Sequence, residues 1–249
     1  MAIAREAEPV GSLKEVREAG LDREDLLGVY RNMLMTRGIE ERGHILYRQG
    51  KIPGSFYTGR GNEAGSVGVA TAMGADDVGT PLHRDMGVHI VRGVEPWRIF
   101  AQYMGRADGP TKGRDGNVHM ADSKLGLIAM VSHLPAMLPV AVGCALAFRI
   151  REEKRVAVGW FGEGASARGD CHEAMTLAGV RKLPMVFVCD NNSGRTRRRR
   201  TWSSRPATSP TAPIPTASKG SSSTAPTCSP STGRRAAQSK RLAPAAARR

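Results

Sequence analysis

The sequence contains no aspartate or glutamate after position 190, although 59 residues follow it. Residues 193–249 hold 13 lysines and arginines. The whole chain has 37 basic and 23 acidic residues, and its net charge of +14 would by itself favour a nucleic-acid or anionic-membrane partner. Taking those 13 from the 37 leaves 24 basic against 23 acidic residues over residues 1–192. The first 192 residues are therefore nearly neutral, and we do not expect nucleic acid as a partner.

Cysteine pairs and long apolar runs are also missing. The N-terminus has no apolar core of a secretory signal peptide. The longest apolar stretch, residues 134–148, contains two prolines and is too short to span a membrane, so it predicts a buried helix and no membrane partner. No CxxC pair occurs, which excludes the spacings typical of zinc sites and disulfide frameworks and favours a cytoplasmic protein with reduced thiols. The four scattered cysteines are Cys144, Cys171, Cys189 and Cys228.

Capping residues and small residues predict the elements of the N-terminal half. Asp22 is a candidate N-cap of a helix that Gly50 ends. Residues 61–74 are rich in small side chains and predict a helix packed closely on a sheet, and residues 76–85 predict a short strand that ends in a polar loop. Residues 105–126 predict a long glycine-rich loop, which in a compact domain is usually functional or mobile. The apolar face expected for the first helix comprises Leu26, Leu27, Tyr30, Leu34, Ile45 and Leu46.

The clearest unit is a strand, a helix and a second strand. Residues 155–161, "RVAVGWF", form a continuous apolar run, as expected for a strand buried on both faces. Residues 171–182 predict a helix, and residues 184–189, "PMVFVC", predict a second buried strand. This order predicts an α/β fold with a parallel sheet flanked by helices. Because ligands of such sheets bind at the carboxyl ends of the strands, Glu163 and Asn192 are candidate site residues.

Glu163 and Asn192 offer oxygen atoms of the kind that Mg²⁺ prefers. Gly162 and Gly164, on either side of Glu163, allow the backbone to approach a diphosphate closely. A bare Gly-x-Gly pattern is weak and by itself more often marks a tight turn beside a solvent-facing glutamate. Here the spacing, the strand-helix-strand context and both oxygen ligands coincide, which favours a metal–diphosphate site.

Several stretches resemble one family. "GNEAGSVG", "LHRDMGVHIVRG", "TKGRDGNVHM", "SHLPAMLPVAVGCALA" and "GEGASARGDCHEAMTLAG" are similar to the α subunit of the first component of 2-oxo acid dehydrogenase complexes, of the branched-chain and pyruvate types. The resemblance covers residues 30–192, about two thirds of the chain. It implies a fold that binds thiamine diphosphate and Mg²⁺, and an oxidoreductase that decarboxylates a small 2-oxo acid and transfers the acyl group to a lipoyl group.

The resemblance also implies roles for individual residues. Glu163, Asn192 and the backbone carbonyl of Gly194 would bind the metal, although the family prefers an aromatic residue at the position of Gly194. The guanidinium of Arg84 would pair with the diphosphate, which suits phosphate geometry. His119, in the glycine-rich loop, is either an ordinary loop histidine or a functional one. The residues implied in cofactor binding are His83, Arg84, Ser132, Leu134, Gly162, Gly164, Ala165 and Asp190; Ser132 and Leu134 would border the aminopyrimidine, and Asp190 stands where some relatives have arginine.

The resemblance stops after Asn192, where the family continues with an aromatic residue and then Ser-Thr-Pro. Codons for residues 193–199, followed by the first two bases of the codon for Arg200, can be chosen so that one nucleotide added in front gives Gln-Trp-Ala-Tyr-Ser-Thr-Pro-Thr. The same shift turns residues 218–227 into Ile-Glu-Gly-Val-Val-Val-Asp-Gly-Thr-Asp, which resembles the next strand and turn of the family. We therefore predict that residues 193–249 are a frameshift product; the alternative is a genuine basic tail that binds nucleic acid.

The predicted organisation has three parts. Residues 1–20 form a loose arm, residues 21–192 an incomplete thiamine-diphosphate-binding domain, and residues 193–249 a basic tail without a packed core. The resemblance implies an α₂β₂ heterotetramer in which the β subunit supplies the glutamate that activates the cofactor, together with a lipoyl acyltransferase core. It also implies a later histidine-containing loop that this chain lacks, so we expect no complete catalytic set. "GEGASARGD" before His172 favours a branched-chain substrate; a pyruvate or acetoin enzyme, and a non-catalytic scaffold, are the alternatives.

Overall fold

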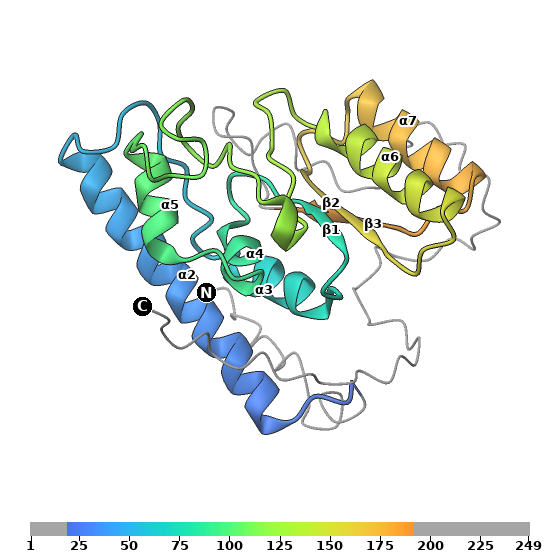
Figure 1. Ribbon diagram of the computed structural model, residues 1–249, viewed down its shortest axis with the longest axis horizontal. Coiled ribbons are helices and arrows are strands. Elements are labelled where there is room, and N and C mark those ends of the chain that lie inside the picture. Colours follow the sequence, from blue (N-terminus) through green and yellow to red (C-terminus); the bar gives the residue numbers. More distant parts are fainter. Residues whose placement is uncertain (1–18, 192–249) are drawn as a thin grey trace, which may run out of the picture. The chain divides into compact units, whose positions relative to one another are not determined.

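The computed structural model describes residues 19–191 of the 249-residue chain (Figure 1). Residues 19–25 belong to a different compact unit from residues 26–191, and the sheet with the helices that pack on it lies within residues 26–191. The elements are α2 (Arg23–Arg48), α3 (Glu63–Ala72), β1 (Val78–Thr80), α4 (Met86–Val91), α5 (Pro96–Tyr103), the short 3₁₀ helix η1 (Ser123–Leu125), α6 (Met137–Ile150), β2 (Ala157–Gly162), α7 (Gly169–Val180) and β3 (Met185–Asp190).

The three strands form one parallel sheet in the order β1-β2-β3. Thr80 of β1 pairs with Gly159 of β2, and Phe161 of β2 pairs with Cys189 of β3. The predicted strand-helix-strand unit is therefore confirmed as β2-α7-β3. Since all three strands run in one direction, their carboxyl ends meet at the same edge of the sheet.

Strand β2 is buried because helices cover both of its faces. Val158 and Trp160 point into a core shared with α2, α3, α4 and α5, whereas Ala157 and Phe161 point into a core shared with α6 and α7. Figure 1 shows α6 and α7 side by side on one side of the sheet and α3 and α4 on the other. Gly159 allows this closeness, because a Cβ atom there would lie 2.8 Å from a methyl group of Leu138.

The prediction of a second fully buried strand is wrong for β3. Val186 is 45% exposed, and Cys189 is also exposed. Within residues 19–191, β3 pairs with β2 on one side and has no neighbouring strand on the other. An apolar run predicts a strand, but it does not tell whether that strand lies inside the sheet or at its edge.

Helix α2 begins and ends where its capping residues predict. The backbone N–H of Asp25 donates to the side chain of Asp22 at 2.8 Å, and the N–H of Asp22 donates back to Asp25 at 3.0 Å. Gly50, with a φ of 70°, follows its C-terminus.

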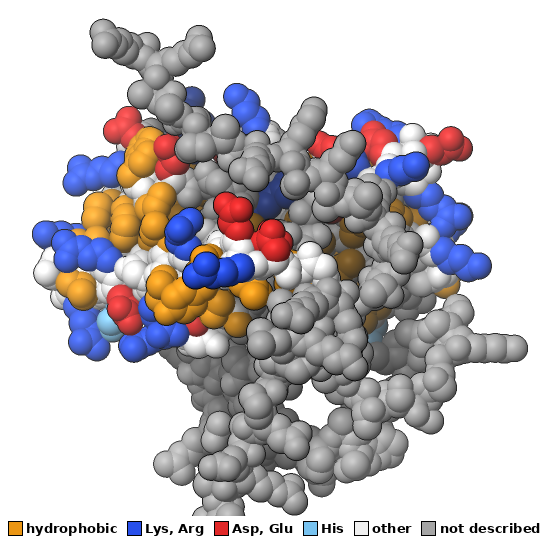
Figure 2. Space-filling view, turned by 90° about the horizontal axis from the view of Figure 1, so that it is seen from below, with side chains coloured by type: hydrophobic (Ala, Val, Ile, Leu, Met, Phe, Trp, Pro, Cys, Tyr) orange, Lys and Arg blue, Asp and Glu red, His pale blue; other side chains and the backbone are white. Residues whose placement is uncertain are grey.

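The apolar face expected for α2 is not its buried face. Five of the six residues named for that face are exposed, and only Leu46 is buried. The buried side instead carries Thr36, Ile39, Glu40 and Gly43. Figure 2 shows that exposed hydrophobic side chains gather in several groups on the face seen from below, among acidic and basic ones.

The predicted helix over residues 134–148 is observed as α6, which starts three residues later and continues to Ile150. Its buried side faces β2 and α7. Among residues 19–191, no helix has the length and apolarity needed to cross a membrane. The predicted arm at residues 1–18 and the predicted tail at residues 193–249 lie outside the described residues.

Candidate functional site at the carboxyl edge of the sheet

The predicted site residues follow the three strands at their common edge. Thr80 ends β1 and leads into the segment that holds His83 and Arg84, Gly162 ends β2, and Asp190 ends β3. Parallel pairing places these three ends together, with Gly162 directly opposite Asp190. The sequence-based prediction that ligand-binding residues gather at this edge agrees with the topology.

Glu163 is fixed beside the end of β3 by backbone hydrogen bonds. Its N–H donates to the carbonyl of Asp190 at 3.2 Å. Its own carbonyl accepts from the hydroxyl of Ser166 at 2.6 Å, and Ala165, which is buried, donates to the carbonyl of Gly162 at 2.9 Å. This tight turn holds the backbone of Glu163 beside Asp190, the last residue of β3. Asn192 and Gly194, the other predicted metal ligands, lie outside the described residues.

Glu163 is the one predicted metal ligand that lies among the described residues, and its carboxylate oxygens are of the kind that a hard divalent cation prefers. Within residues 19–191, the Glu163 side chain takes part in no ion pair and no side-chain hydrogen bond, so its oxygens are available to a ligand. Residues 19–191 contain no cluster of three or more His, Cys, Asp or Glu side chains suited to a metal. A metal bound here would therefore need the asparagine and backbone oxygens that the sequence predicts after Asp190.

Asp85 is a buried acid that the sequence-based prediction missed. Its Oδ2 accepts the N–H of Leu82 at 2.9 Å, and its Oδ1 has no hydrogen-bond partner among residues 19–191. Burial, together with the charge of Asp190, raises the pKa of Asp85 well above its usual value. The burial of Asp85 and the nearby Asp190 carboxyl therefore favour the protonated form of Asp85, at the start of α4.

Arg84 is held by the segment between α2 and α3. Its Nη1 donates to the carbonyl of Thr58 at 2.9 Å, the only hydrogen bond that its guanidinium makes within residues 19–191. The remaining N–H groups suit a phosphate oxygen. Gly59 is required here, because a Cβ atom would lie 2.0 Å from the Arg84 carbonyl oxygen.

Glu40 holds the same segment from the opposite side. Its carboxylate accepts the N–H of Gly59 and the hydroxyl of Thr58, both at 2.9 Å. Burial raises the pKa of Glu40. No sequence motif predicted this role, although the position of Glu40 beside Ile39, on the helix side that also carries Gly43 and Leu46, marks it in retrospect as buried.

His83 precedes Arg84 and is neutral at physiological pH. Burial, and then the charges of Arg84 and His119, lower the pKa of His83 to about 4. The ring of Tyr57 contacts it edge-on, with ring centroids 4.9 Å apart. His83 is therefore suited to neutral hydrogen bonding and not to binding an anion by charge.

His119, Asp115 and Ser132 form a second group, in the glycine-rich loop and the segment before α6. Nδ1 of His119 lies 3.1 Å and 3.2 Å from the two carboxylate oxygens of Asp115, and Nε2 lies 3.3 Å from the hydroxyl of Ser132. Leu134, two residues on, is half-buried against the core. The structure thus joins the predicted residue Ser132 to His119, whose role the sequence left open, and to Asp115, which the sequence-based prediction missed.

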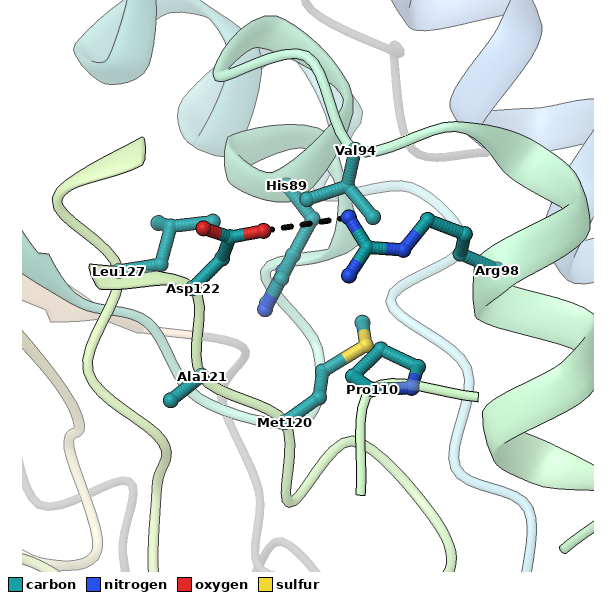
Figure 3. Close-up of a pocket in the computed structure, with 8 residues that line it drawn as sticks. All are labelled: His89, Val94, Arg98, Pro110, Met120, Ala121, Asp122 and Leu127. Atoms are coloured by element: carbon teal, nitrogen blue, oxygen red, sulfur yellow. Dashed lines mark hydrogen bonds and ion pairs between the residues drawn. The ribbon is translucent and has the colours of Figure 1, made fainter. Parts of the chain in front are cut away.

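A narrow pocket lies elsewhere, between α4, α5 and the glycine-rich loop, with room for about one water molecule (Figure 3). Arg98 and Asp122 form an ion pair of 3.2 Å at its wall. His89 is 2% exposed, its Nδ1 has no hydrogen-bond partner among residues 19–191, and burial lowers its pKa to about 4. No predicted cofactor-binding residue lines this pocket, so it is not the predicted site.

The fold is that of an α/β protein in which Glu163 follows one parallel strand and Asp190 ends its neighbour. The family described as dehydrogenase E1 component matches residues 30–209, and the chain belongs to that family. Enzymes of this family depend on thiamine diphosphate. The predicted resemblance is confirmed, and the match also covers the first 17 residues after Asn192, where we expected it to end.

Three similar proteins are named for three different activities. The chain is 36% identical over 182 residues to the α subunit of an acetoin:2,6-dichlorophenolindophenol oxidoreductase from Bacillus subtilis (72% of this chain, 55% of the relative). It is 37% identical to the 2-oxoisovalerate dehydrogenase α subunit of the same organism (70% and 53%). It is 36% identical to the pyruvate dehydrogenase E1 α subunit of Zymomonas mobilis (69% and 49%). The chain spans about half the length of these relatives.

Proposed function

We propose that this chain is the α half of a 2-oxo acid dehydrogenase E1 component, which binds thiamine diphosphate and Mg²⁺ at the carboxyl edge of its sheet. The observation that carries the proposal is the backbone hydrogen bond from Glu163 to Asp190, which joins the ends of β2 and β3, the two strands that the predicted metal ligands follow in the sequence. The family match supports the cofactor class.

In this proposal each residue has a binding task. Glu163, Asn192 and the carbonyl of Gly194 hold the metal, and Arg84 pairs with the diphosphate. Ser132 and Leu134 lie against the aminopyrimidine. If bound there, thiamine diphosphate would supply the electron sink that decarboxylation of a 2-oxo acid requires. The protein residues position it and exclude water.

A branched-chain 2-oxo acid is the substrate that we propose first. The basis is the stretch "GEGASARGD" followed by His172, together with a relative named 2-oxoisovalerate dehydrogenase. Relatives named for acetoin and for pyruvate keep those two substrates as alternatives. Oxidative transfer of the acyl group to lipoyl belongs to the same proposal.

The proposed partners are a β subunit, in an α₂β₂ heterotetramer, and a lipoyl acyltransferase core. In the proposal the β subunit supplies the glutamate that activates the aminopyrimidine, so the active site lies between two chains. The exposed edge of β3 and the exposed apolar side chains of α2 are surfaces that such an assembly can cover.

We further propose that residues 193–249 are out of frame. The abrupt loss of acidic residues after Asp190 supports this, since shifted codons of a GC-rich gene yield Arg, Pro, Ser, Thr and Ala. Sequencing the gene across the codons for residues 191–200 tests it: an uninterrupted frame would favour a genuine basic tail, whose binding to nucleic acid would weaken steeply with salt.

Calorimetry tests the cofactor proposal. Thiamine diphosphate is titrated into the 249-residue chain with Mg²⁺ and again with EDTA, and thiamine without phosphates serves as the control ligand. We expect binding that EDTA abolishes and no binding of thiamine. Binding that EDTA leaves unchanged would overturn the metal assignment.

A further inference from the structure

Helices α6 and α7 end beside each other at the amino edge of the sheet. Ile150 is the last residue of α6 and Val180 is the last residue of α7, and the chain enters β2 and β3 a few residues further on. Nη1 of Arg149 donates to the carbonyls of Arg181 and Lys182, the latter at 2.9 Å, so it joins the two helix ends. Figure 1 shows the two helices side by side on one face of the sheet. Their joined ends lie away from the carboxyl edge, where the cofactor is proposed to bind.

The joined helix ends carry the two most exposed large aliphatic side chains among residues 19–191. Ile150 is 73% exposed and Val180 is 57% exposed. Ile150 follows Arg149 and Val180 precedes Arg181, so both adjoin the contact between the helix ends. Because apolar surface in water is unfavourable, a partner that covers both side chains gains free energy.

Unpaired cations surround these two aliphatic side chains. Residues 149–155 and 181–182 hold six basic and two acidic residues, whereas residues 1–192 as a whole are nearly neutral. Glu153 pairs with Arg151 at 3.7 Å and with Arg155 at 3.1 Å. Within residues 19–191, no carboxylate forms an ion pair with the exposed cations Arg149, Lys154, Arg181 and Lys182.

We propose that Ile150, Val180 and the surrounding cations form a docking surface for an acidic protein segment that carries an apolar residue between its carboxylates. The arginine side chains suit carboxylates, which they bind through two parallel hydrogen bonds, and the aliphatic pair suits the apolar residue. This surface is independent of the proposed cofactor, because it lies at the opposite edge of the sheet.

Other partners fit the surface less well. A second copy of this chain cannot bind it symmetrically, because cations would then face cations. Residues 149–155 and 180–182 include no aromatic ring on which a nucleic-acid base could stack. A lipid surface would require a longer apolar face than two aliphatic side chains provide.

Fluorescence anisotropy with labelled peptides tests the proposal on the 249-residue chain. The probe is Glu-Glu-Leu-Glu-Glu-Leu-Glu-Glu, and its control has serine in place of both leucines. We expect the parent to bind the leucine peptide about fivefold more tightly than the serine peptide, because leucine meets the aliphatic pair. Ile150→Ser should lose this preference, whereas Leu34→Ser, an exposed change on α2, should keep it. A preference that survives in Ile150→Ser would overturn the apolar centre of the surface.

Charge variants separate this surface from the basic residues of the tail. Arg181→Glu with Lys182→Asn should weaken binding of the leucine peptide by at least about tenfold. Asparagine suits the second position, because Lys182 has a φ of 48°. Arg197→Glu with Arg198→Asn makes the same change of charge within residues 193–249, and we expect binding within about twofold of the parent. Equal losses in the two double variants, or no binding of the peptide to the parent, would overturn the proposal.

Two further probes test the other classes of partner. Vesicles of phosphatidylcholine and phosphatidylserine and a short DNA duplex are added separately to the parent and to the variant with Arg181→Glu and Lys182→Asn. We expect that variant to bind both probes as the parent does, because residues 193–249 hold 13 basic residues of their own. A loss of vesicle or DNA binding in that variant, greater than its loss of peptide binding, would assign the surface to a lipid or a nucleic acid and overturn the proposal.

Discussion

Asp85 and Asp190, which are 105 positions apart in the sequence, interact at the edge of the sheet, where burial and the Asp190 carboxyl together raise the pKa of Asp85. Asp85 is fully buried, and neither its Oδ1 nor the Oδ2 of Asp190 has a hydrogen-bond partner among residues 19–191. The pair connects the segment that carries Arg84 with the strand that leads to Asn192. This interaction therefore links the segment of Arg84, proposed to bind the diphosphate, to the strand that precedes Asn192, proposed to bind the metal.

Replacing Asp85 tests whether its carboxyl is protonated, or charged, beside the carboxyl of Asp190. Asp85→Asn keeps a hydrogen-bond donor toward Asp190, and we expect its free energy of unfolding at pH 7 to stay within about 1 kcal/mol of the parent. Asp85→Ala removes the donor and leaves Asp190 and Leu82 without this partner. We expect it to lose about 1–3 kcal/mol, measured by urea unfolding. Equal losses in the two variants would contradict a protonated Asp85.

His89 should make the protein less stable in mild acid. Burial lowers its pKa to about 4, below the value of 6.5 in the unfolded chain. As the pH falls below 6.5, His89 takes up a proton in the unfolded chain but stays neutral in the folded chain. The free energy of unfolding therefore decreases progressively down to about pH 4. Between these two pH values the slope of the free energy of unfolding against pH approaches about 1.4 kcal/mol per pH unit. His83, with a pKa of about 4, adds a second contribution of the same sign.

Urea unfolding at about pH 7 and about pH 4.5 measures this loss. His89→Leu should lose less stability between the two pH values than the parent, by about 2 kcal/mol. The exposed His172→Leu serves as the matched control and should leave the difference unchanged. The readout is the difference between the two pH values, so a general destabilisation by either substitution does not affect it. A His89→Leu variant with the same pH dependence as the parent would contradict the burial argument.

The sequence predicted the elements better than it predicted their contacts. The apolar run of β2 and the caps of α2 are local signals, and both were confirmed. The exposure of β3 depends on which strands lie next to it, and the buried side of α2 is chosen by packing, so neither follows from local composition.

The sequence also predicted where some of the proposed site residues lie. Glu163 follows β2 and Asp190 ends β3, as the strand-helix-strand pattern indicated, and their roles in binding stay predictions. Asp85 was missed because its partner lies across the fold, and Asp115 was missed because a spacing of four residues has no fixed meaning in a loop. Asp85 interacts with Asp190, and Asp115 contacts His119. No short sequence motif identifies a residue whose role is to contact another site residue.

Glu163→Ala tests the metal assignment in a chain whose reading frame has been restored. The change removes one proposed protein ligand, and alanine offers no oxygen in its place. We expect the affinity for thiamine diphosphate with Mg²⁺ to fall by at least about tenfold, since a bond to a charged group contributes about 1.5–3 kcal/mol. Glu173→Ala, an exposed change on α7, is the control. Calorimetry measures the affinity and circular dichroism the fold; an affinity within twofold of the parent refutes the assignment.

The 249-residue chain itself should not decarboxylate any 2-oxo acid. The family resemblance implies a histidine-containing loop after the next strand, and the sequence from residue 193 onward contains no histidine. We therefore expect no release of labelled CO₂ from branched-chain 2-oxo acids or pyruvate, even with a β subunit and a lipoyl partner present, and we expect activity to return when the frame is restored. A limited tryptic digest run in parallel should cut within residues 193–249, which hold 13 basic residues, before it cuts residues 26–191. Turnover by the 249-residue chain, or survival of its arginine-rich segment in the digest, would show that residues 193–249 are a working part of the protein and that the frameshift proposal is wrong.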